Sequence, residues 1–237
     1  MALTISATDL GFYASWRFCL RCAWVRLHVK SLPYQSFPGI FSTIDGYNKL
    51  IVRNHFKRES ALPAWLRVLG EVGDYVPPPH WSRFKTLDAE SGVTLRGEAD
   101  GIFRMADGSY TIVDYKTARH TLSQRGMLPW YRVQLNAYAY IGERQGLSPV
   151  SRLALVYMEP QTGEDTARDP RLVDELGFSM GFQANIVDVD LRPEEMIPPL
   201  LRKVREVGGM EVPPEGRLGC RDCGALHALV ETLGSPH

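Results

Sequence analysis

Two acidic residues and a lysine, carried by neighbouring segments rich in β-forming residues, are the groups in this sequence best suited to catalysis. The first segment contains Asp100 within Gly-Glu-Ala-Asp-Gly-Ile, and the second contains Asp114 and Lys116 within Ile-Val-Asp-Tyr-Lys-Thr. An Asp-Gly turn between two such runs is a strong hairpin signal, so residues 93–104 and 109–116 are expected to form adjacent antiparallel strands. The polar ends of the two strands should then lie close together.

The chemistry expected of these residues is metal-dependent hydrolysis. Side chains alternate along a strand, so Asp114 and Lys116 share one face while Val113 and Tyr115 share the other. With Asp100 and the main-chain carbonyl of Tyr115, Asp114 would form an all-oxygen site suited to Mg²⁺ or Mn²⁺. Such a cation withdraws charge from a phosphoryl group, and the nearby ammonium of Lys116 can position the nucleophile or stabilise the developing charge. The set predicts cleavage of a phosphodiester.

A third motif lies in an expected helix at residues 130–145, where Gln134 and Tyr138 are four residues apart and share one face. The motifs Gly-x-x-Asp-x-Ile, Asp-x-Lys-Thr and Gln-x-x-x-Tyr, in this order, resemble the PD-(D/E)XK nuclease superfamily, and specifically its RecB-type branch. The resemblance covers residues 93–141 well and the rest loosely.

This resemblance implies a restriction-endonuclease-like core and a deoxyribonuclease that uses Mg²⁺ or Mn²⁺. It further implies an exonuclease or single-strand-acting enzyme of DNA repair, recombination or defence, with DNA as substrate and a helicase or another protein of those pathways as partner. Two alternatives stay open: a protein of the same fold that binds nucleic acid without cleaving it, and a structural or redox metalloprotein. A hairpin with a surface salt bridge would do no chemistry and would contribute little stability.

The resemblance also implies a further metal ligand on an upstream helix, usually a histidine, whose Gly-x-x-x-His motif is not clear in this chain. His55 lies on an expected helix at residues 42–58, and Asp45 lies near its start. Either residue, or neither, is the ligand. Glu98 would share a face with Asp100 on a strand, where it either assists the metal or pairs with a nearby arginine.

Four cysteines form two Cys-x-x-Cys pairs, one near each end of the chain: Cys19, Cys22, Cys220 and Cys223. A two-residue gap lets both thiolates of a pair reach one metal centre. Some similar RecB-type nucleases carry a [4Fe–4S] cluster, which is therefore implied here, but their usual arrangement is one early and three late cysteines. The two-and-two arrangement leaves Zn²⁺ as an alternative. Basic residues around the first pair are expected to lower the pKa of its thiols.

The bulk properties suit one globular domain. The 237 residues, with ordinary hydrophobic and charged content, can bury a sizeable core. We expect a single nuclease domain over residues 1–237, with a helical part at 1–80, a β-rich core at 90–190, and a helix and cysteine pair at 191–237. No long apolar run or signal-like start is found, so a cytoplasmic protein without membrane contact is expected. A net charge of zero does not indicate nonspecific coating of nucleic acid.

The order of helix, hairpin, helix and strand predicts an α/β fold, a mixed sheet flanked by helices, with the chain ends joined by the cysteine metal site. The remaining expected elements are helices at residues 9–29, 64–70 and 193–207, strands at 151–158 and 178–190, and a polar loop at 159–177.

Overall fold

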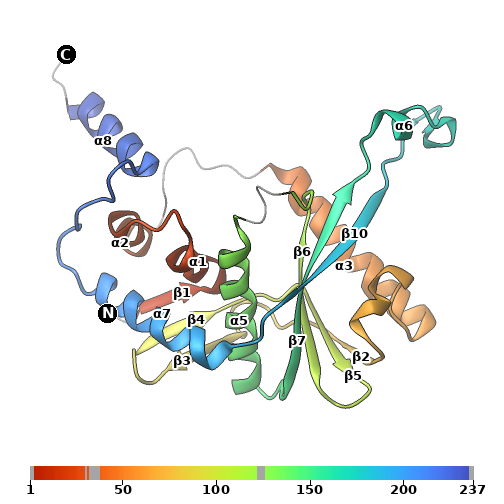
Figure 1. The fold of residues 1–237 in the computed structure, drawn as a ribbon, viewed down its shortest axis with the longest axis horizontal. Helices are drawn as coiled ribbons and strands as arrows, with labels where there is room; N and C mark the ends of the chain where they lie inside the picture. Colours follow the sequence, from red (N-terminus) through yellow and green to blue (C-terminus); the bar gives the residue numbers. More distant parts are fainter. Residues whose placement is uncertain (1–2, 30, 32–37, 122–125, 235–237) are drawn as a thin grey trace.

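The computed structural model describes residues 3–29, 31, 38–121 and 126–234. A mixed sheet lies at its centre and helices cover both faces (Figure 1), so the predicted α/β fold is confirmed. Among the described residues, no helix is both long and apolar enough to cross a lipid bilayer.

The central sheet has five strands in the order β10-β7-β6-β5-β2. The strands are β2 (Val72–Val76), β5 (Gly101–Met105), β6 (Tyr110–Lys116), β7 (Val150–Pro160) and β10 (Phe182–Val189). β6 and β7 run parallel, whereas the other neighbours are antiparallel. The predicted hairpin is confirmed for β5 and β6, in which Gly101 pairs with Val113 and Arg104 with Tyr110.

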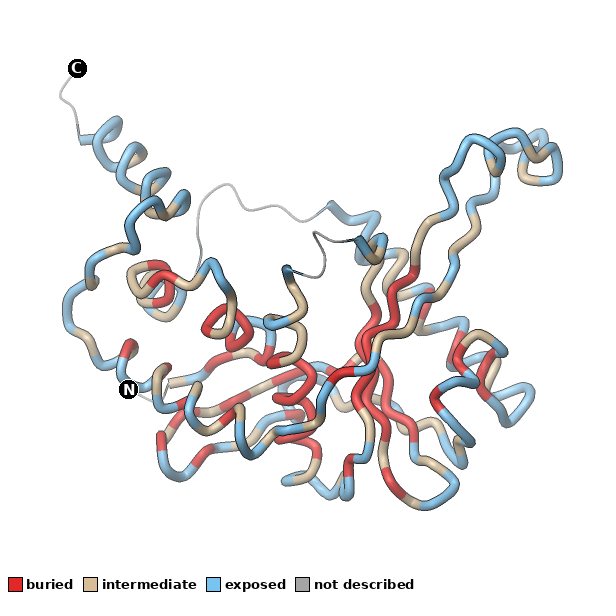
Figure 2. Tube along the Cα trace, viewed as in Figure 1, coloured by how far each residue is buried: buried red, intermediate tan, exposed pale blue. Residues whose placement is uncertain are grey.

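Strand β6 is buried on both faces, because a different set of helices covers each. On one face, Ile112 packs in a core with α5 (Leu128–Arg144) and α7 (Pro193–Gly208). On the other face, Val113 and Tyr115 pack with α3 (Gly39–Glu59) and the 3-10 helix Ala64–Leu69. Figure 2 shows that buried residues concentrate in the crossing strands and in α5. The alternation therefore points Asp114 toward α5 and Tyr115 toward α3.

Residues 93–104 do not form one strand, so this prediction is wrong. β4 (Val93–Arg96) belongs to a separate sheet with β1 (Leu3–Ser6) and β3 (Lys85–Asp88), in the order β1-β4-β3. The chain leaves this sheet at Gly97, where a Cβ atom would lie 2.7 Å from ring carbon Cδ1 of Tyr138, so only glycine fits without a shift. A loop, and not strand alternation, therefore positions Glu98 and Asp100.

The predicted N-terminal helix is interrupted. α1 (Ala7–Gly11) begins after Ser6, whose hydroxyl accepts a hydrogen bond from the amide of Asp9 at 3.0 Å. A 3-10 turn, Phe12–Ala14, follows, and the helix resumes only as α2 (Leu20–His28). The chain lies extended at Ser15 and Cys19, so the first cysteine is placed before α2 and not within a continuous helix.

Several elements were not predicted. Outside the expected loop they are the short strands β1, β2 and β3 and the helix α8 (Arg221–Gly234). Within the expected loop they are α6 (Glu164–Ala167), the 3-10 turn Pro170–Leu172 and the small hairpin of β8 (Val173–Asp174) and β9 (Gly177–Phe178). These loop elements lie at the tip of an arm that β7 and β10 extend away from the body (Figure 1). Strands of two to five residues carry too little alternation to be recognised from sequence.

Candidate active site

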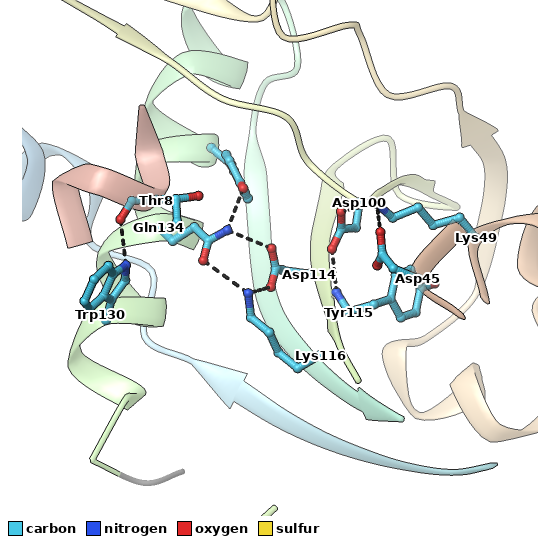
Figure 3. A network of polar contacts seen from close by, with 10 residues as sticks. Thr8, Asp45, Lys49, Asp100, Asp114, Tyr115, Lys116, Trp130 and Gln134 are labelled. Atoms are coloured by element: carbon cyan, nitrogen blue, oxygen red, sulfur yellow. Dashed lines mark hydrogen bonds and ion pairs between the residues drawn. The ribbon is translucent and has the colours of Figure 1, made fainter. Parts of the chain in front are cut away.

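A network of buried polar side chains connects the end of β6 with α5. The side chain of Asp114 is 3% exposed, and its Oδ2 lies 2.5 Å from Nζ of Lys116. Its Oδ1 accepts a hydrogen bond from Nε2 of Gln134 at 3.0 Å, and Oε1 of Gln134 accepts one from Lys116 at 3.2 Å. Nε2 of Gln134 also donates to the hydroxyl of Tyr138 at 2.7 Å. Hydrogen bonds and an ion pair therefore connect four of the five predicted catalytic residues in one continuous network (Figure 3).

Lys116 carries a positive charge in this network. Burial alone would disfavour that charge, but the carboxylate of Asp114 outweighs the effect and raises the pKa of Lys116. The ammonium also lies 4.3 Å from the ring centroid of Tyr131, a favourable cation–π distance. The site thus holds a permanent cation beside a buried carboxylate.

Asp100, the fifth residue, lies near this network without bonding to it. Its Oδ2 accepts a hydrogen bond from the amide of Tyr115 at 2.8 Å. Burial raises the pKa of Asp100 to about 7, and the charge of Asp114 adds to the rise while Lys49 opposes it. The two carboxylates therefore repel each other across a poorly solvated space. A divalent cation held by both would remove this penalty, so the donors fit Mg²⁺ or Mn²⁺.

Tyr115, which lies between Asp114 and Lys116, contributes its main chain and its ring to different parts of the structure. The main chain of Tyr115 connects Asp114 with Lys116, and its amide orients Asp100. Its ring points toward α3, and its buried hydroxyl has no hydrogen-bond partner among the described residues. Of the oxygen atoms of Tyr115, the main-chain carbonyl oxygen, which is the predicted one, is the candidate metal ligand, and the hydroxyl is not.

Sequence reasoning missed Lys49 on α3. Its Nζ lies 2.6 Å from Oδ1 of Asp100 and 2.7 Å from Oδ2 of Asp45. The four-residue spacing of Asp45 and Lys49 is typical of a helical ion pair and would have indicated this contact. His55 lies ten residues beyond Asp45, about 15 Å along the helix at roughly 1.5 Å per residue, and its Nδ1 is 3.4 Å from Nη2 of Arg58. Of the two candidate extra ligands, Asp45 is the one near Asp100.

Two hollows adjoin the polar network. The lysine hollow, of about 420 Å³, is lined by Phe41, Asp45, Tyr115, Lys116, Thr117 and Tyr131, among others. The tryptophan hollow, of about 370 Å³, is lined by Thr8, Trp81, Arg96, Gly97, Glu98 and Tyr138, among others. Glu98 thus lines the second hollow, whereas Asp100 does not line it. Since Lys116 lines one hollow and Tyr138 the other, the network of Gln134 connects the two.

The four cysteines form a second candidate metal site. The sulfur of Cys223 lies 3.5 Å from those of Cys19 and Cys22, and the sulfur of Cys220 lies 3.5 Å from that of Cys22. All four sulfurs lie within 4.8 Å of one another, although the two pairs are separated by almost the whole chain. The predicted joining of the two ends of the chain by the cysteines is confirmed as a cluster that could bind a metal ion.

The ionisation of these thiols differs from the prediction. Burial opposes ionisation of Cys19, but hydrogen bonds from the amides of Cys22 and Arg217 and from neighbouring thiols lower its pKa to about 6. Burial, together with contacts to the other thiols, raises the pKa of Cys22. Burial and the contacts with Cys19 and Cys220 raise the pKa of Cys223 to about 11, although the contact with Cys22 opposes the rise. Arg21 donates instead to a main-chain carbonyl, at 2.8 Å. Backbone amides and neighbouring thiols, rather than basic side chains, therefore lower the pKa of Cys19.

Of three comparisons with known proteins, one gives a family match. The family model of the PD-(D/E)XK nuclease superfamily matches residues 41–227, more than half of the chain, including α3, the central sheet, α5 and the second cysteine pair. A comparison with curated proteins found no match. A crystal structure of SSO0001 is similar with a TM-score of 0.42 and 14% identity, and the alignment covers 90% of this chain and 79% of that one. Because the family model matches more than half of its residues, the chain belongs to the PD-(D/E)XK nuclease superfamily.

Proposed function

We propose that this protein is a Mg²⁺- or Mn²⁺-dependent deoxyribonuclease of the RecB-type branch that acts on DNA ends or single strands. The observation that carries the proposal is the buried contact of Asp114, Lys116 and Gln134, with Asp100 beside it. A buried charge is costly unless it is paired, so such a cluster at the edge of two hollows is typical of a functional site.

In this proposal Asp100, Asp114 and the carbonyl of Tyr115 hold the cation, which would supply an activated water and withdraw charge from the phosphoryl oxygens. Lys116 positions the attacking water and stabilises the negative charge that develops on the phosphate. Gln134 keeps both groups in place, because its carbonyl accepts from the ammonium while its amide donates to the carboxylate. Tyr138 accepts the second amide hydrogen of Gln134 and so prevents the amide from rotating.

Cleavage itself provides the test of this function. Purified protein should degrade labelled single-stranded DNA in the presence of Mn²⁺, and EDTA should stop the reaction. An RNA strand of the same sequence, measured in parallel, establishes whether the substrate is DNA. Intact DNA at every metal concentration, with protein that is folded by circular dichroism, would refute the nuclease proposal.

The tryptophan hollow supports a single-stranded substrate. Trp81 is 44% exposed at the hollow, and the guanidinium of Arg96 lies 4.9 Å from its ring centroid. An exposed indole can stack on an unpaired base, and the guanidinium that lies over its ring can contact the adjoining phosphate. Paired bases in a duplex do not present their faces in this way, so the hollow favours DNA with a free end or strand.

Replacing Trp81 by alanine is therefore expected to weaken the binding of single-stranded DNA by roughly tenfold, since a stacked base contributes about 1–3 kcal/mol. Fluorescence anisotropy with a labelled oligonucleotide in EDTA measures binding without cleavage. Trp16→Ala is a matched control, because Trp16 is 66% exposed and also carries an arginine, Arg17, at 4.9 Å, but does not line the hollow. Equal affinities of the two variants would exclude the stacking role.

For the cysteine site we infer a single structural Zn²⁺ ion, although the resemblance implies an iron–sulfur cluster. Thiolates on one tetrahedral zinc ion, with Zn–S bonds of about 2.3 Å, lie about 3.8 Å apart. Three of the six sulfur–sulfur separations are 3.5 Å, close to this value, and none exceeds 4.8 Å. In a [4Fe–4S] cluster each cysteine binds a different iron, so the sulfurs must lie farther apart. Metal analysis of protein purified without oxygen should find zinc in a colourless sample, whereas a brown sample containing iron would contradict the inference.

A further inference from the structure

Lys49 forms a bridge between two carboxylates beside the candidate metal site (Figure 3). The side chain of Lys49 is 31% exposed, that of Asp45 36% and that of Asp100 only 13%. Nζ of Lys49 lies 2.6 Å from Asp100 and 2.7 Å from Asp45, so the ammonium is held directly between the two carboxylates. The ammonium of Lys49 therefore already contacts the carboxylate of Asp100, where a metal ion would bind.

Both oxygens of Asp100 are in use. Oδ1 contacts the ammonium of Lys49, and Oδ2 accepts the hydrogen bond from the amide of Tyr115. A divalent cation bound through Oδ1 would lie next to the ammonium. Two neighbouring cations repel each other strongly in a partly buried site, where the effective dielectric constant is low. Lysine differs here from a rigid ligand, because its four-carbon stem lets the ammonium move while the helix stays in place.

We propose that Lys49 is a resident counter-ion that must leave Asp100 when a divalent cation binds, so that Lys49 lowers the metal affinity of the site. This proposal rests on the proposed function. When the ammonium of Lys49 leaves, Asp45 also becomes free. Asp45 lines the lysine hollow together with Lys116 and can then serve as a third carboxylate ligand. In the metal-free protein, the same ammonium relieves the repulsion among Asp45, Asp100 and Asp114.

Lys49→Met removes the charge and keeps much of the stem, so it is expected to bind Mn²⁺ at least about tenfold more tightly than the wild type, a gain of about 1.4 kcal/mol. Isothermal titration calorimetry measures this affinity without DNA or cleavage. In EDTA, the variant should have a lower melting temperature than the wild type, and Mn²⁺ should raise its melting temperature by more. Lys57→Met is the matched control, because Lys57 is exposed on the same helix. Lys49→Gln, which is neutral and can still donate to both carboxylates, replaces Lys49→Met in the titration if that variant does not fold.

The outcomes separate the possible roles of Lys49. Unchanged or weaker Mn²⁺ binding by both neutral variants, with normal binding by the wild type, would overturn the counter-ion role and leave the proposed nuclease function intact. Absence of Mn²⁺ binding in all variants would refute the metal site itself, and both proposals with it. Adding Asp45→Asn to Lys49→Met should remove most of the gain in affinity. A gain that survives this change would show that Asp45 is not a ligand.

Discussion

Replacing Lys116 by alanine is expected to slow DNA cleavage by at least about 10²-fold, the usual cost of removing one group that stabilises a developing negative charge. Lys116 Nζ is the cation nearest Asp114, at 2.5 Å, and it also lines the lysine hollow, where a phosphate could approach. The variant loses no metal ligand, so calorimetry should show that Mn²⁺ still binds. Single-turnover cleavage of labelled single-stranded DNA, at saturating protein and Mn²⁺, measures the effect on the chemical step.

The structure adds a stability effect to this experiment. Without Lys116, Gln134 is the one remaining hydrogen-bond donor to the buried Asp114 side chain among the described residues, and leaving half of a buried ion pair costs about 3–5 kcal/mol. The melting temperature in EDTA should therefore fall, and Mn²⁺ should restore much of it by compensating the carboxylate. Asp114→Asn provides the contrast, because it should lose Mn²⁺ affinity as well as activity. A Lys116→Ala variant that cleaves as fast as the exposed-site control Lys57→Ala would remove Lys116 from the mechanism.

Replacing any one cysteine of the cluster by serine is expected to lower the melting temperature by about 10 °C. In a chain of this size about 1 kcal/mol of unfolding free energy corresponds to roughly 2–4 °C, so this shift represents a loss of a few kcal/mol. The binding energy of a structural metal is folding energy, and here the site crosslinks residues about 200 positions apart. The effect should be largest for the C-terminal segment: no residue of α8 is buried, so packing alone does little to hold this helix.

Differential scanning calorimetry and limited proteolysis measure this effect together. In Cys19→Ser and Cys223→Ser, protease should cut between α7 and α8 much faster than in the wild type. Leu218→Ser is a suitable control, because Leu218 lies in the same segment but is 97% exposed. Metal-free protein with an unaltered melting temperature in all four serine variants would disprove a shared metal centre, and would leave the nuclease proposal unaffected.

Local rules were sufficient to predict which side chains share a face in the central part of the candidate active site. Asp114 and Lys116 share a face because side chains alternate along any strand, and Gln134 and Tyr138 share a face because four residues make about one helical turn. These relations depend only on backbone geometry within one element. The Cys-x-x-Cys spacing likewise predicted a metal-binding pair at each end of the chain.

Contacts between elements were decided by tertiary packing. The single strand predicted at residues 93–104 is two strands in two sheets, because the chain must bend at Gly97 to pass the ring of Tyr138 on a helix forty residues away. That bend also turns Glu98 into the tryptophan hollow. The sequence around Asp100 carries no sign of this helix, so the position of its carboxylate could not be predicted.

The bridge from Lys49 to Asp100 illustrates the division between the two levels. The pairing of Lys49 with Asp45 follows from their spacing on one helix and was available in the sequence. Its contact with Asp100 exists only because α3 packs on the Tyr115 face of the sheet, opposite α5. Helical period and strand alternation act over a few residues, and so they determined which side chains each element presents. Which of these side chains contact one another depends on how the helices pack on the two faces of the sheet through the two hydrophobic cores. Only the tertiary structure decided that packing.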